Sequence, residues 1–502
     1  MSDENDIKQS ARDDVLALGV RLLVYASILI IPAILFIRFQ FLPFDDCLRH
    51  AAKVVSGRSW GEIVLLRECM SVDQHPGWHA FLSVLHLYFG MGKEQLVFVE
   101  WTLLFIFVSV AAVPFFRRPE SWVAAMLLAC LALPENYMFR LTRGRPYLLT
   151  ETVLLVLLAL WGRNERKTLL LQAATIGLIA LSTFVHGTAW YLWILLVMAF
   201  VLSGRKGDAV RFCGCWLVGV LLGAMFTGRP FSYLYQLLEI PFLSFGNGAL
   251  ARMLVGEFQP DSGRLIYLLA IGFVFLVRYV VTQVWLHDSA ERFLLTLAAI
   301  GWLGGLHVSR LWNEWGLPSA QLWLAFVIQD ILMSFKSQSF SVRLVLPAGL
   351  CLGLILSASG DLDGRWSRAV VPVKYGDCVN LYSGSSDAGK NIGNDWLPGD
   401  GGVVYNSQMD VFDLFFFKYP SGKWRYVYGF EAGLMTEENL KVLRNIQFNH
   451  GGWAAYKPWS NAMRAKDRLI VISSGQPEIS SLEWLEYEKN LWIGRTITVP
   501  NK

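Results

Sequence analysis

Long apolar runs separated by short polar segments dominate the first 358 positions of the chain. A bilayer-spanning helix needs about 20 predominantly apolar residues, and eleven runs approach that length, several of them falling short of it. The pattern predicts helices at roughly 15–37, 95–115, 121–134, 147–161, 168–184, 187–203, 211–227, 264–284, 292–308, 318–335 and 342–358.

The composition supports the same interpretation. Hydrophobic residues make up 54% of the chain, charged residues make up 17%, and the mean hydropathy is +0.42. A soluble protein of this size is less apolar. We therefore predict a polytopic α-helical membrane protein with about 11 transmembrane helices. The first run is too long for a signal peptide and lacks a small-residue cleavage site, so we expect it to stay as an anchor.

The positions of lysine and arginine predict an orientation. With a cytoplasmic N-terminus, the inner loops carry most of the basic residues, as the positive-inside rule requires. Eleven spans then place the first long loop, 39–94, and the C-terminal residues on the outer face, and we expect a bacterial inner (plasma) membrane. The inner-loop residues are Arg117, Arg118, Arg163, Arg166, Lys167, Arg205, Lys206, Arg211, Arg292, Lys336 and Arg343.

A change in composition at 357–364, which is rich in glycine and aspartate, predicts a domain boundary. Residues 1–358 form the predicted transmembrane domain and 359–502 a soluble extracytoplasmic domain. Within the latter, strand-like runs occur at 402–405, 424–428 and 468–473, and Thr436 resembles the N-cap of a helix. We expect a small α/β domain.

Two adjacent carboxylates, Asp45 and Asp46, follow the first apolar run directly. Acids at a membrane exit are costly unless they face water or take part in chemistry. The same loop continues with His75 and His79 among aromatic residues, a combination that suggests a sugar or phosphate site. An interfacial loop that merely carries polar residues remains the alternative.

Arginines 140, 143 and 145 form a second cluster that the topology places outside, against the positive-inside trend. Guanidinium groups hold phosphate oxygens through a planar fork of donors, so these side chains are candidates for binding an anionic lipid head group or a pyrophosphate. A belt of arginines on lipid head groups would give the same pattern.

Two further candidates lie at predicted outer helix ends. His186 follows the fifth apolar run, and His307 and Arg310 follow the ninth. A histidine whose hydrogen bonds are satisfied in the core is the alternative for His186.

The arrangement as a whole resembles the GT-C superfamily of membrane glycosyltransferases, which includes protein O-mannosyltransferases, aminoarabinose transferases and oligosaccharyltransferase catalytic subunits. The resemblance depends on the acidic pair Asp45-Asp46 in a long first outer loop, the outer arginines and the C-terminal soluble domain. The Trp-Trp-Asp tripeptide of oligosaccharyltransferases is absent, which argues against that branch.

The resemblance implies a sugar donor linked to polyprenyl phosphate and a lipid, glycan or protein acceptor on the outer face. The pair Asp45-Asp46 would contain the catalytic carboxylate, acting as general base or supporting a divalent cation such as Mg or Mn. The arginines would stabilise the departing lipid phosphate. We expect membrane lipids as partners and no nucleic acid.

Other functions share these features. A transporter or flippase of an anionic lipid-linked saccharide would use the same arginines without covalent chemistry, although transporters place ionisable groups near the bilayer midplane. A polysaccharide polymerase or ligase would use the same lipid-linked chemistry. A third possibility is an inactive membrane scaffold whose outer domain performs the function. The polar first loop disfavours it.

Overall fold

The computed structural model describes residues 2–39, 46–68, 70, 72–133, 137–163, 168–246, 259–261, 265–283, 285, 289–335, 340–360, 394–449, 452–488 and 490–497. The chain divides into two compact units. Unit 1 comprises Met1–Phe41, Trp101–Phe226 and Glu257–Pro372, and unit 2 comprises Leu42–Glu100, Thr227–Gly256 and Val373–Lys502.

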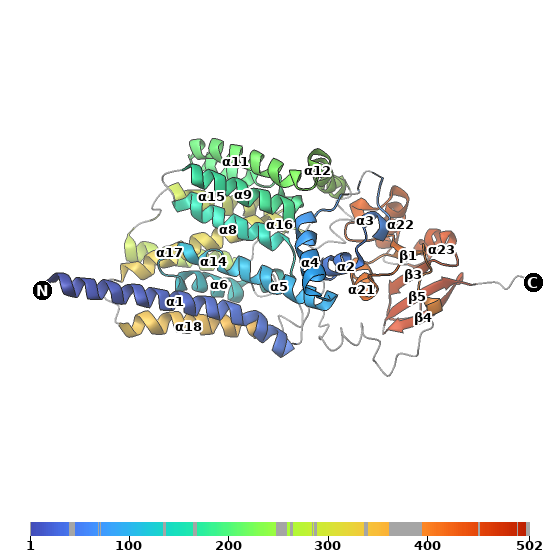
Figure 1. Cartoon of the computed structure of the whole chain (residues 1–502), viewed down its shortest axis with the longest axis horizontal. Coiled ribbons are helices and arrows are strands. Elements are labelled where there is room, and N and C mark those ends of the chain that lie inside the picture. Colours follow the sequence, from blue (N-terminus) through green and yellow to red (C-terminus); the bar gives the residue numbers. More distant parts are fainter. Residues whose placement is uncertain are drawn as a thin grey trace, which may run out of the picture. The chain divides into compact units, whose positions relative to one another are not determined.

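Unit 1 consists of helices (Figure 1). Its longer members are α1 (Ser2–Phe39), most of α5 (Lys93–Val110), α6 (Glu120–Ala132), α8 (Tyr147–Arg163), α9 (Leu169–Val185), α10 (Ile194–Leu202), α11 (Lys206–Met225), α14 (Leu265–Thr282), α15 (Ser289–Gly305), α17 (Leu317–Ser334) and α18 (Phe340–Ser359). Its shorter described segments include α7 (Tyr137–Thr142), α16 (Ser309–Leu311) and a π-helical segment, Trp312–Gly316.

Each of the eleven predicted apolar runs coincides with a helix, which confirms the polytopic helical architecture. Within the described residues, six helices are long and apolar enough to cross a membrane: Val15–Arg38, Lys93–Phe115, Lys206–Met225, Leu265–Thr282, Ser309–Ser334 and Val342–Ser359. Four of the other predicted spans are shorter apolar helices, Glu120–Ala132, Tyr147–Gly162, Leu169–Val185 and Gly187–Leu202.

Small residues permit close helix packing in unit 1. A Cβ added at Gly223 of α11 would lie 2.4 Å from the carbonyl oxygen of Ala180 on α9, and one at Gly219 would lie 2.9 Å from that of Ile176. Close approach of backbones at glycine is typical of helix pairs in membranes. The two glycines therefore fix the contact between α9 and α11.

A buried ionic triad joins three helices of unit 1. The guanidinium of Arg278, on α14, is fully buried and lies 2.7 Å from Oε1 of Glu291, in the first turn of α15, and 3.5 Å from Oδ2 of Asp330 on α17. Arginine is always charged, so the triad carries permanent charge inside the helical bundle. No local sequence pattern predicts the triad, because its three members lie on separate helices.

Unit 2 combines short helices with a small sheet (Figure 1). From the first long loop come α2 (Asp46–Ser56), α3 (Trp60–Ile63) and α4 (Pro76–Phe89), and α12 (Pro230–Gly246) follows later in the chain. The C-terminal residues supply α21 (Met409–Lys418), α22 (Glu437–Phe448) and α23 (Lys457–Ala462) together with β1 (Val403–Asn406), β2 (Arg425–Tyr426), β3 (Arg468–Ile472), β4 (Leu482–Glu488) and β5 (Leu491–Thr496).

The five strands form one mixed sheet in the order β2-β1-β3-β5-β4, with parallel pairs at β2-β1 and β1-β3 and antiparallel pairs at β3-β5 and β5-β4. Three of these strands coincide with the predicted runs, and α22 begins after Thr436, as predicted. The expected small α/β region is confirmed.

The first long loop packs against the C-terminal residues within unit 2. Val64 forms a parallel bridge with Tyr426, and Leu66 an antiparallel bridge with Met435. Arg58 donates to the carbonyl oxygens of Gly422 and Trp424. Segments more than 350 residues apart in sequence are thus joined by the Arg58 side chain and by two backbone hydrogen bonds, from Leu65 N–H to the carbonyl oxygen of Tyr426 and from Arg67 N–H to that of Leu434.

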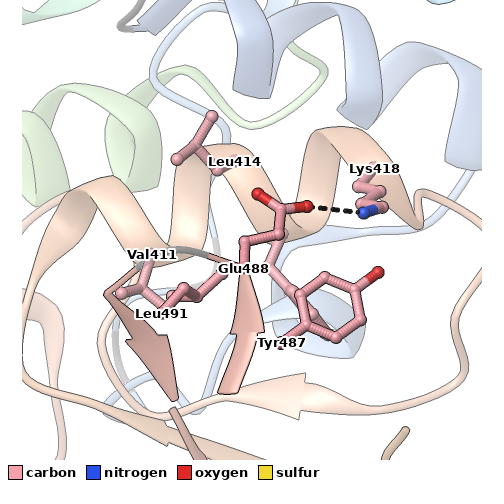
Figure 2. Close-up of a pocket in the computed structure, with 7 residues that line it drawn as sticks. Val411, Leu414, Lys418, Tyr487, Glu488 and Leu491 are labelled. Atoms are coloured by element: carbon pink, nitrogen blue, oxygen red, sulfur yellow. Dashed lines mark hydrogen bonds and ion pairs between the residues drawn. The ribbon is translucent and has the colours of Figure 1, made fainter. Parts of the chain in front are cut away.

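A small pocket opens between α21 and the last two strands (Figure 2). Its empty volume is about 350 Å³, open solvent at its mouth included. The lining is mostly apolar, and at its rim Nζ of Lys418 lies 2.9 Å from Oε1 of Glu488. The lining residues are Val411, Leu414, Phe415, Lys418, Tyr487, Glu488 and Leu491.

Candidate functional site

Helix α2, which begins at Asp46, places a row of charged and polar side chains inside unit 2. Asp46, His50 and Lys53 follow one another at helical spacing and share one face with Arg49. The helix packs against α4 and α21, and His50 is fully buried. Buried polar groups of this kind are stable only when they are hydrogen-bonded or paired, so the row marks α2 as a candidate site.

His79 on α4 connects this row to a carboxylate. Its Nδ1 lies 2.6 Å from Oδ2 of Asp73, and its Nε2 lies 2.8 Å from Nδ1 of His50. An ionised carboxylate only accepts hydrogen bonds, so His79 donates from Nδ1. With a neutral ring, His79 Nε2 then accepts and His50 donates from Nδ1. We call this directed chain, Asp73–His79–His50, the relay.

The relay is held in place by neighbouring groups. Pro76 occupies the first turn of α4 and Gly90 its left-handed C-cap, so both ends of the helix that carries His79 are defined by sequence. Asp73 also accepts from the backbone N–H of His75 at 3.0 Å and from the Trp60 indole at 3.3 Å. The ring of His75 packs edge-on against that of His50, with centroids 5.0 Å apart.

These contacts decide the charge of Asp73. Burial favours the neutral acid, but the hydrogen bonds from His79 and from the backbone N–H of His75, with the positive charge that His79 carries when protonated, outweigh it and hold the pKa of Asp73 well below its usual range. Burial lowers the pKa of the Lys53 ammonium, an effect that the charges of Asp73 and Glu62 partly oppose. Asp73 is therefore an anion at neutral pH and orients His79 without taking its proton.

The acidic pair predicted to be catalytic is described only in part. Asp45 lies outside the described residues. Asp46 occupies the first turn of α2, where the helix dipole favours an anion, and its Oδ1 lies 2.6 Å from Nη1 of Arg49. Asp46 thus lies one helical turn from His50 and on the same face of α2.

In unit 1, two of the predicted substrate-binding arginines meet at a carboxylate. Oε1 of Glu314 lies 2.9 Å from Nη2 of Arg140 and 3.0 Å from Nε of Arg310. Glu314 belongs to the π-helical segment ahead of α17, a distortion that often occurs at functional sites. Two predicted clusters that are far apart in sequence are thereby joined.

The other two arginines of the predicted cluster lie beside Arg140 in a tight turn. The guanidinium of Arg143 lies 3.5 Å from the centre of the Phe139 ring, and Arg145 is buried. Gly144, between them, has φ +64°, and an added Cβ would lie 3.1 Å from Cα of Trp101. The turn therefore requires glycine.

His186 and His307 differ in their surroundings. His186 caps the C-terminus of α9 and is buried, with its Nδ1 3.2 Å from Oγ1 of Thr150 and its Nε2 2.8 Å from Oγ1 of Thr188. Its ring also lies 6.5 Å from that of Tyr147, over which the Arg140 guanidinium stacks. His307 is exposed in the turn before α16.

Sequence reasoning missed three residues that organise these clusters. Asp73 and His50 received no role because a single acid or histidine in a loop has no pattern of its own. Glu314 received none because its importance comes from a π-helical turn and from two partners on separate segments. The helical spacing of Asp46, His50 and Lys53 was a readable signal.

Within the described residues, no group of three or more His, Cys, Asp and Glu side chains is placed to hold a metal ion. Asp45, which the resemblance would place at the expected divalent cation, lies outside the described residues.

No protein-family model and no curated protein matches the sequence. The chain is similar to a solved structure described as the Archaeoglobus fulgidus oligosaccharyltransferase in complex with Zn and sulfate, with a TM-score of 0.42 and 11% sequence identity over 91% of this chain and 67% of that one. At this identity and TM-score, the similarity assigns no role to any residue of this chain.

Proposed function

We propose that the protein is an integral-membrane glycosyltransferase of the GT-C type, which moves a sugar from a polyprenyl-phosphate-linked donor to an acceptor on the outer face of the membrane. The observation that carries the proposal is the row of acid, guanidinium, imidazole and ammonium groups on α2, of which Arg49 and His50 are buried, in the segment that follows the first apolar helix. A membrane protein retains such a row only where it is paired or takes part in chemistry.

The first loop would supply the groups that activate the acceptor. A hydroxyl is a poor nucleophile until a base takes its proton, and a positioned base contributes about 10²–10⁴-fold to the rate. Asp45 would act as the base and Asp46 would orient it, with Arg49 fixing the Asp46 side chain through their ion pair.

The arginine cluster of unit 1 would hold the donor phosphate. Arg140, Arg143 and Arg145 lie in one short stretch, and Arg310 joins them through Glu314. Forked guanidinium donors stabilise the negative charge that develops on a departing phosphate. His186 and His307 would contact the substrate from neighbouring helix ends.

Release of polyprenyl phosphate tests the proposal without knowledge of the acceptor. The purified protein in lipid vesicles would receive polyprenyl-phosphate sugars and a membrane extract that contains acceptors. We expect release that is lost in Asp46→Asn and unchanged in the control Arg211→Gln, an arginine whose side chain is 55% exposed. Movement of intact donor across the bilayer without release would contradict the proposal and favour a flippase. Dialysis against a chelator, followed by Mg or Mn, tests the expected cation.

A further inference from the structure

A second pocket of unit 2 lies where three segments that are distant in sequence meet. Leu66 and Gln74 line it from the first long loop, Gln236 lines it from α12, and Phe430 and Leu434 line it from the C-terminal region. Its empty volume is about 260 Å³, open solvent at its mouth included. All of its described lining residues belong to unit 2, so the pocket is formed within that unit.

Hydrogen bonds hold the walls of this pocket in place. The backbone N–H of Val72 donates to Oε1 of Gln236 at 3.1 Å, which joins the first long loop to α12. The backbone N–H of Arg67 donates to the carbonyl oxygen of Leu434 at 3.0 Å, which joins the same loop to the C-terminal region. The pocket is therefore formed before any ligand arrives, and binding sites for small molecules are usually of this kind.

Gln74 marks the pocket as a binding site. The residue is only 7% exposed, and its Nε2 is buried and has no hydrogen-bond partner among the described residues. A buried donor without an acceptor destabilises a protein, so native structures contain few of them. A leucine would fill a similar space without this cost. An unpaired donor in the wall of a pocket is expected where a bound ligand supplies the acceptor.

The rest of the lining defines the chemistry of that ligand. Among the described lining residues there is no charged side chain. The charged residues Asp73, next to Gln74, and Glu239, three residues after Gln236, are both acids, which disfavour an anion such as a phosphate.

Two side-chain amides, each of which can donate and accept hydrogen bonds, stand among apolar walls that include the Phe430 ring. Hydroxyl groups also donate and accept, and a sugar ring carries them around an apolar C–H face. A neutral sugar ring therefore complements this lining better than a charged or purely apolar ligand does.

The pocket is connected to the acidic pair through Phe430. The guanidinium of Arg49 lies 5.2 Å from the centre of the Phe430 ring, and Nη1 of Arg49 lies 2.6 Å from Oδ1 of Asp46. The ring of Trp60 packs against the same phenyl ring, with centroids 4.6 Å apart. One wall of the pocket is thus fixed by the residues that also fix Asp46.

We propose that this pocket binds a neutral sugar ring, with Nε2 of Gln74 donating a hydrogen bond to one of its hydroxyl oxygens and Phe430 packing against its C–H face. The identification of the ligand as a sugar rests on the proposed function. The ring belongs either to the polyprenyl-linked donor or to a glycan acceptor, and the chemistry of the pocket is the same for both. Gln74 is then a specificity-determining residue of the transferase.

The first experiment measures binding without activity. Saturation-transfer NMR on the full-length protein in lipid nanodiscs would use the methyl pyranosides of glucose, galactose, mannose, xylose and N-acetylglucosamine, with methyl phosphate as the anionic probe. We expect at least one pyranoside to bind, and Gln74→Leu to weaken its binding about fivefold to tenfold through the lost hydrogen bond. Gln408→Leu, which alters an exposed glutamine of the same unit, is the matched control and should bind as the intact protein does.

Absence of pyranoside binding, or binding that is equal in Gln74→Leu and the intact protein, would overturn the proposal. So would a Gln74→Leu variant that loses affinity for methyl phosphate instead of for a sugar, because the pocket would then be an anion site.

The second experiment measures thermal unfolding in the absence of sugar. Because Gln74→Leu removes an unpaired buried donor, the variant should unfold at the same temperature as the intact protein or at a higher one. A lower unfolding temperature would mean that the Gln74 amide is already satisfied within the folded protein, and it would overturn the proposal.

Gln236→Glu provides a second variant. It keeps an oxygen that can accept from the Val72 N–H but replaces the amide nitrogen that faces the ligand chemistry of the pocket. Pyranoside binding should weaken in this variant as well, and unchanged binding in both variants would overturn the proposal.

Release of polyprenyl phosphate distinguishes the two sources of the sugar. If the ring belongs to the donor, Gln74→Leu should raise the KM for the polyprenyl-phosphate sugar. If it belongs to the acceptor, the variant should instead need more acceptor extract for half-maximal release. Release by the intact protein that Gln74→Leu leaves unchanged in both respects would overturn the inference and leave the proposed function standing. Pyranoside binding that depends on Gln74, without release by the intact protein, would count against the glycosyltransferase and leave the sugar pocket supported.

Discussion

The two compact units bury their charges in different ways. Unit 1 uses arginine: Arg278 with two carboxylates, and Arg140 and Arg310 around Glu314. Unit 2 also buries arginines, Arg49 among them, but its first loop adds imidazoles and a carboxylate, joined in a chain from Asp73 to His50. Arginine keeps its charge at any physiological pH, whereas histidine changes its charge near neutrality. The first arrangement is therefore suited to holding an anion or fixing helices, and the second to moving a proton.

The largest expected effect concerns the structural charges of unit 1. Arg278→Met would leave the buried Glu291 and the half-buried Asp330 without their cation, and breaking a buried ion pair in this way typically costs about 3–5 kcal/mol. Thermal unfolding in detergent should show a marked loss of stability. The triple variant Arg278→Met, Glu291→Gln, Asp330→Asn should recover most of it.

Arg211→Met, which alters an exposed arginine, is the control for this series. A loss of less than about 1 kcal/mol in Arg278→Met would contradict the triad's role as a fastener between α14, α15 and α17, since exposed pairs are worth no more than that.

The next effect concerns the acidic pair of unit 2. Asp46→Asn should lower the rate of phosphate release at least about hundredfold, because the charge beside the reacting hydroxyl is lost. It also leaves Arg49 buried without its carboxylate. The double variant Asp46→Asn, Arg49→Gln should regain stability but not activity. Recovery of activity in the double variant would mean that Asp46 serves only to pair with Arg49.

The sequence predicts the helices of unit 1 well, but it does not predict the contacts between segments that are distant in sequence, and both results have a physical reason. Apolar runs predicted each of the eleven helices, because burial in lipid imposes a length and a composition on the local sequence. The sequence also predicted part of the small sheet, since β1, β2 and β3 coincide with the predicted strand-like runs. The contacts of Val64 with Tyr426 and of Arg140 with Glu314 were not predictable, because each joins segments that tertiary packing alone brings together.

The pH dependence of stability tests the charge of Asp73. Its pKa is depressed in the folded protein, so its contribution to stability is fully present above the unfolded value of about 3.9 and is lost as the pH falls below it. Asp73→Asn should cost about 1.5–3 kcal/mol at pH 7, the range for hydrogen bonds to charged groups. The difference from the intact protein should shrink below about pH 4.

Thermal or chemical unfolding of both proteins across that pH range would measure the difference, with Asp400→Asn, whose side chain is 78% exposed, as the control. A difference that grows on acidification would mean that Asp73 is not the charged end of the relay.

A smaller effect on lipid binding is expected when an arginine of unit 1 is replaced by lysine, which keeps the positive charge and changes only the geometry of the hydrogen-bond donors. Arg143→Lys and Arg145→Lys preserve the positive charge but lose the forked donors, so binding of polyprenyl phosphate should weaken about tenfold in each. A spin-down assay with vesicles that contain the lipid would measure it. Unchanged binding in the Arg143→Ala, Arg145→Ala double variant would point to a belt on lipid head groups.

The substitution with the smallest expected effect serves to determine on which side of the membrane the sheet of unit 2 lies. Lys423 is exposed, its side chain being 75% accessible, and its pairing with the exposed Asp400 contributes little, so Lys423→Cys should leave folding and activity unchanged. The described native cysteines are buried or half-buried, so they should react slowly.

The positive-inside pattern and eleven spans place the C-terminal region outside. We therefore expect a membrane-impermeant maleimide to label Lys423→Cys in intact cells, above the background of the unsubstituted protein. Labelling only after permeabilisation would place the sheet, and the first loop that is hydrogen-bonded to it, in the cytoplasm, where a polyprenyl-linked donor on the outer face could not reach them.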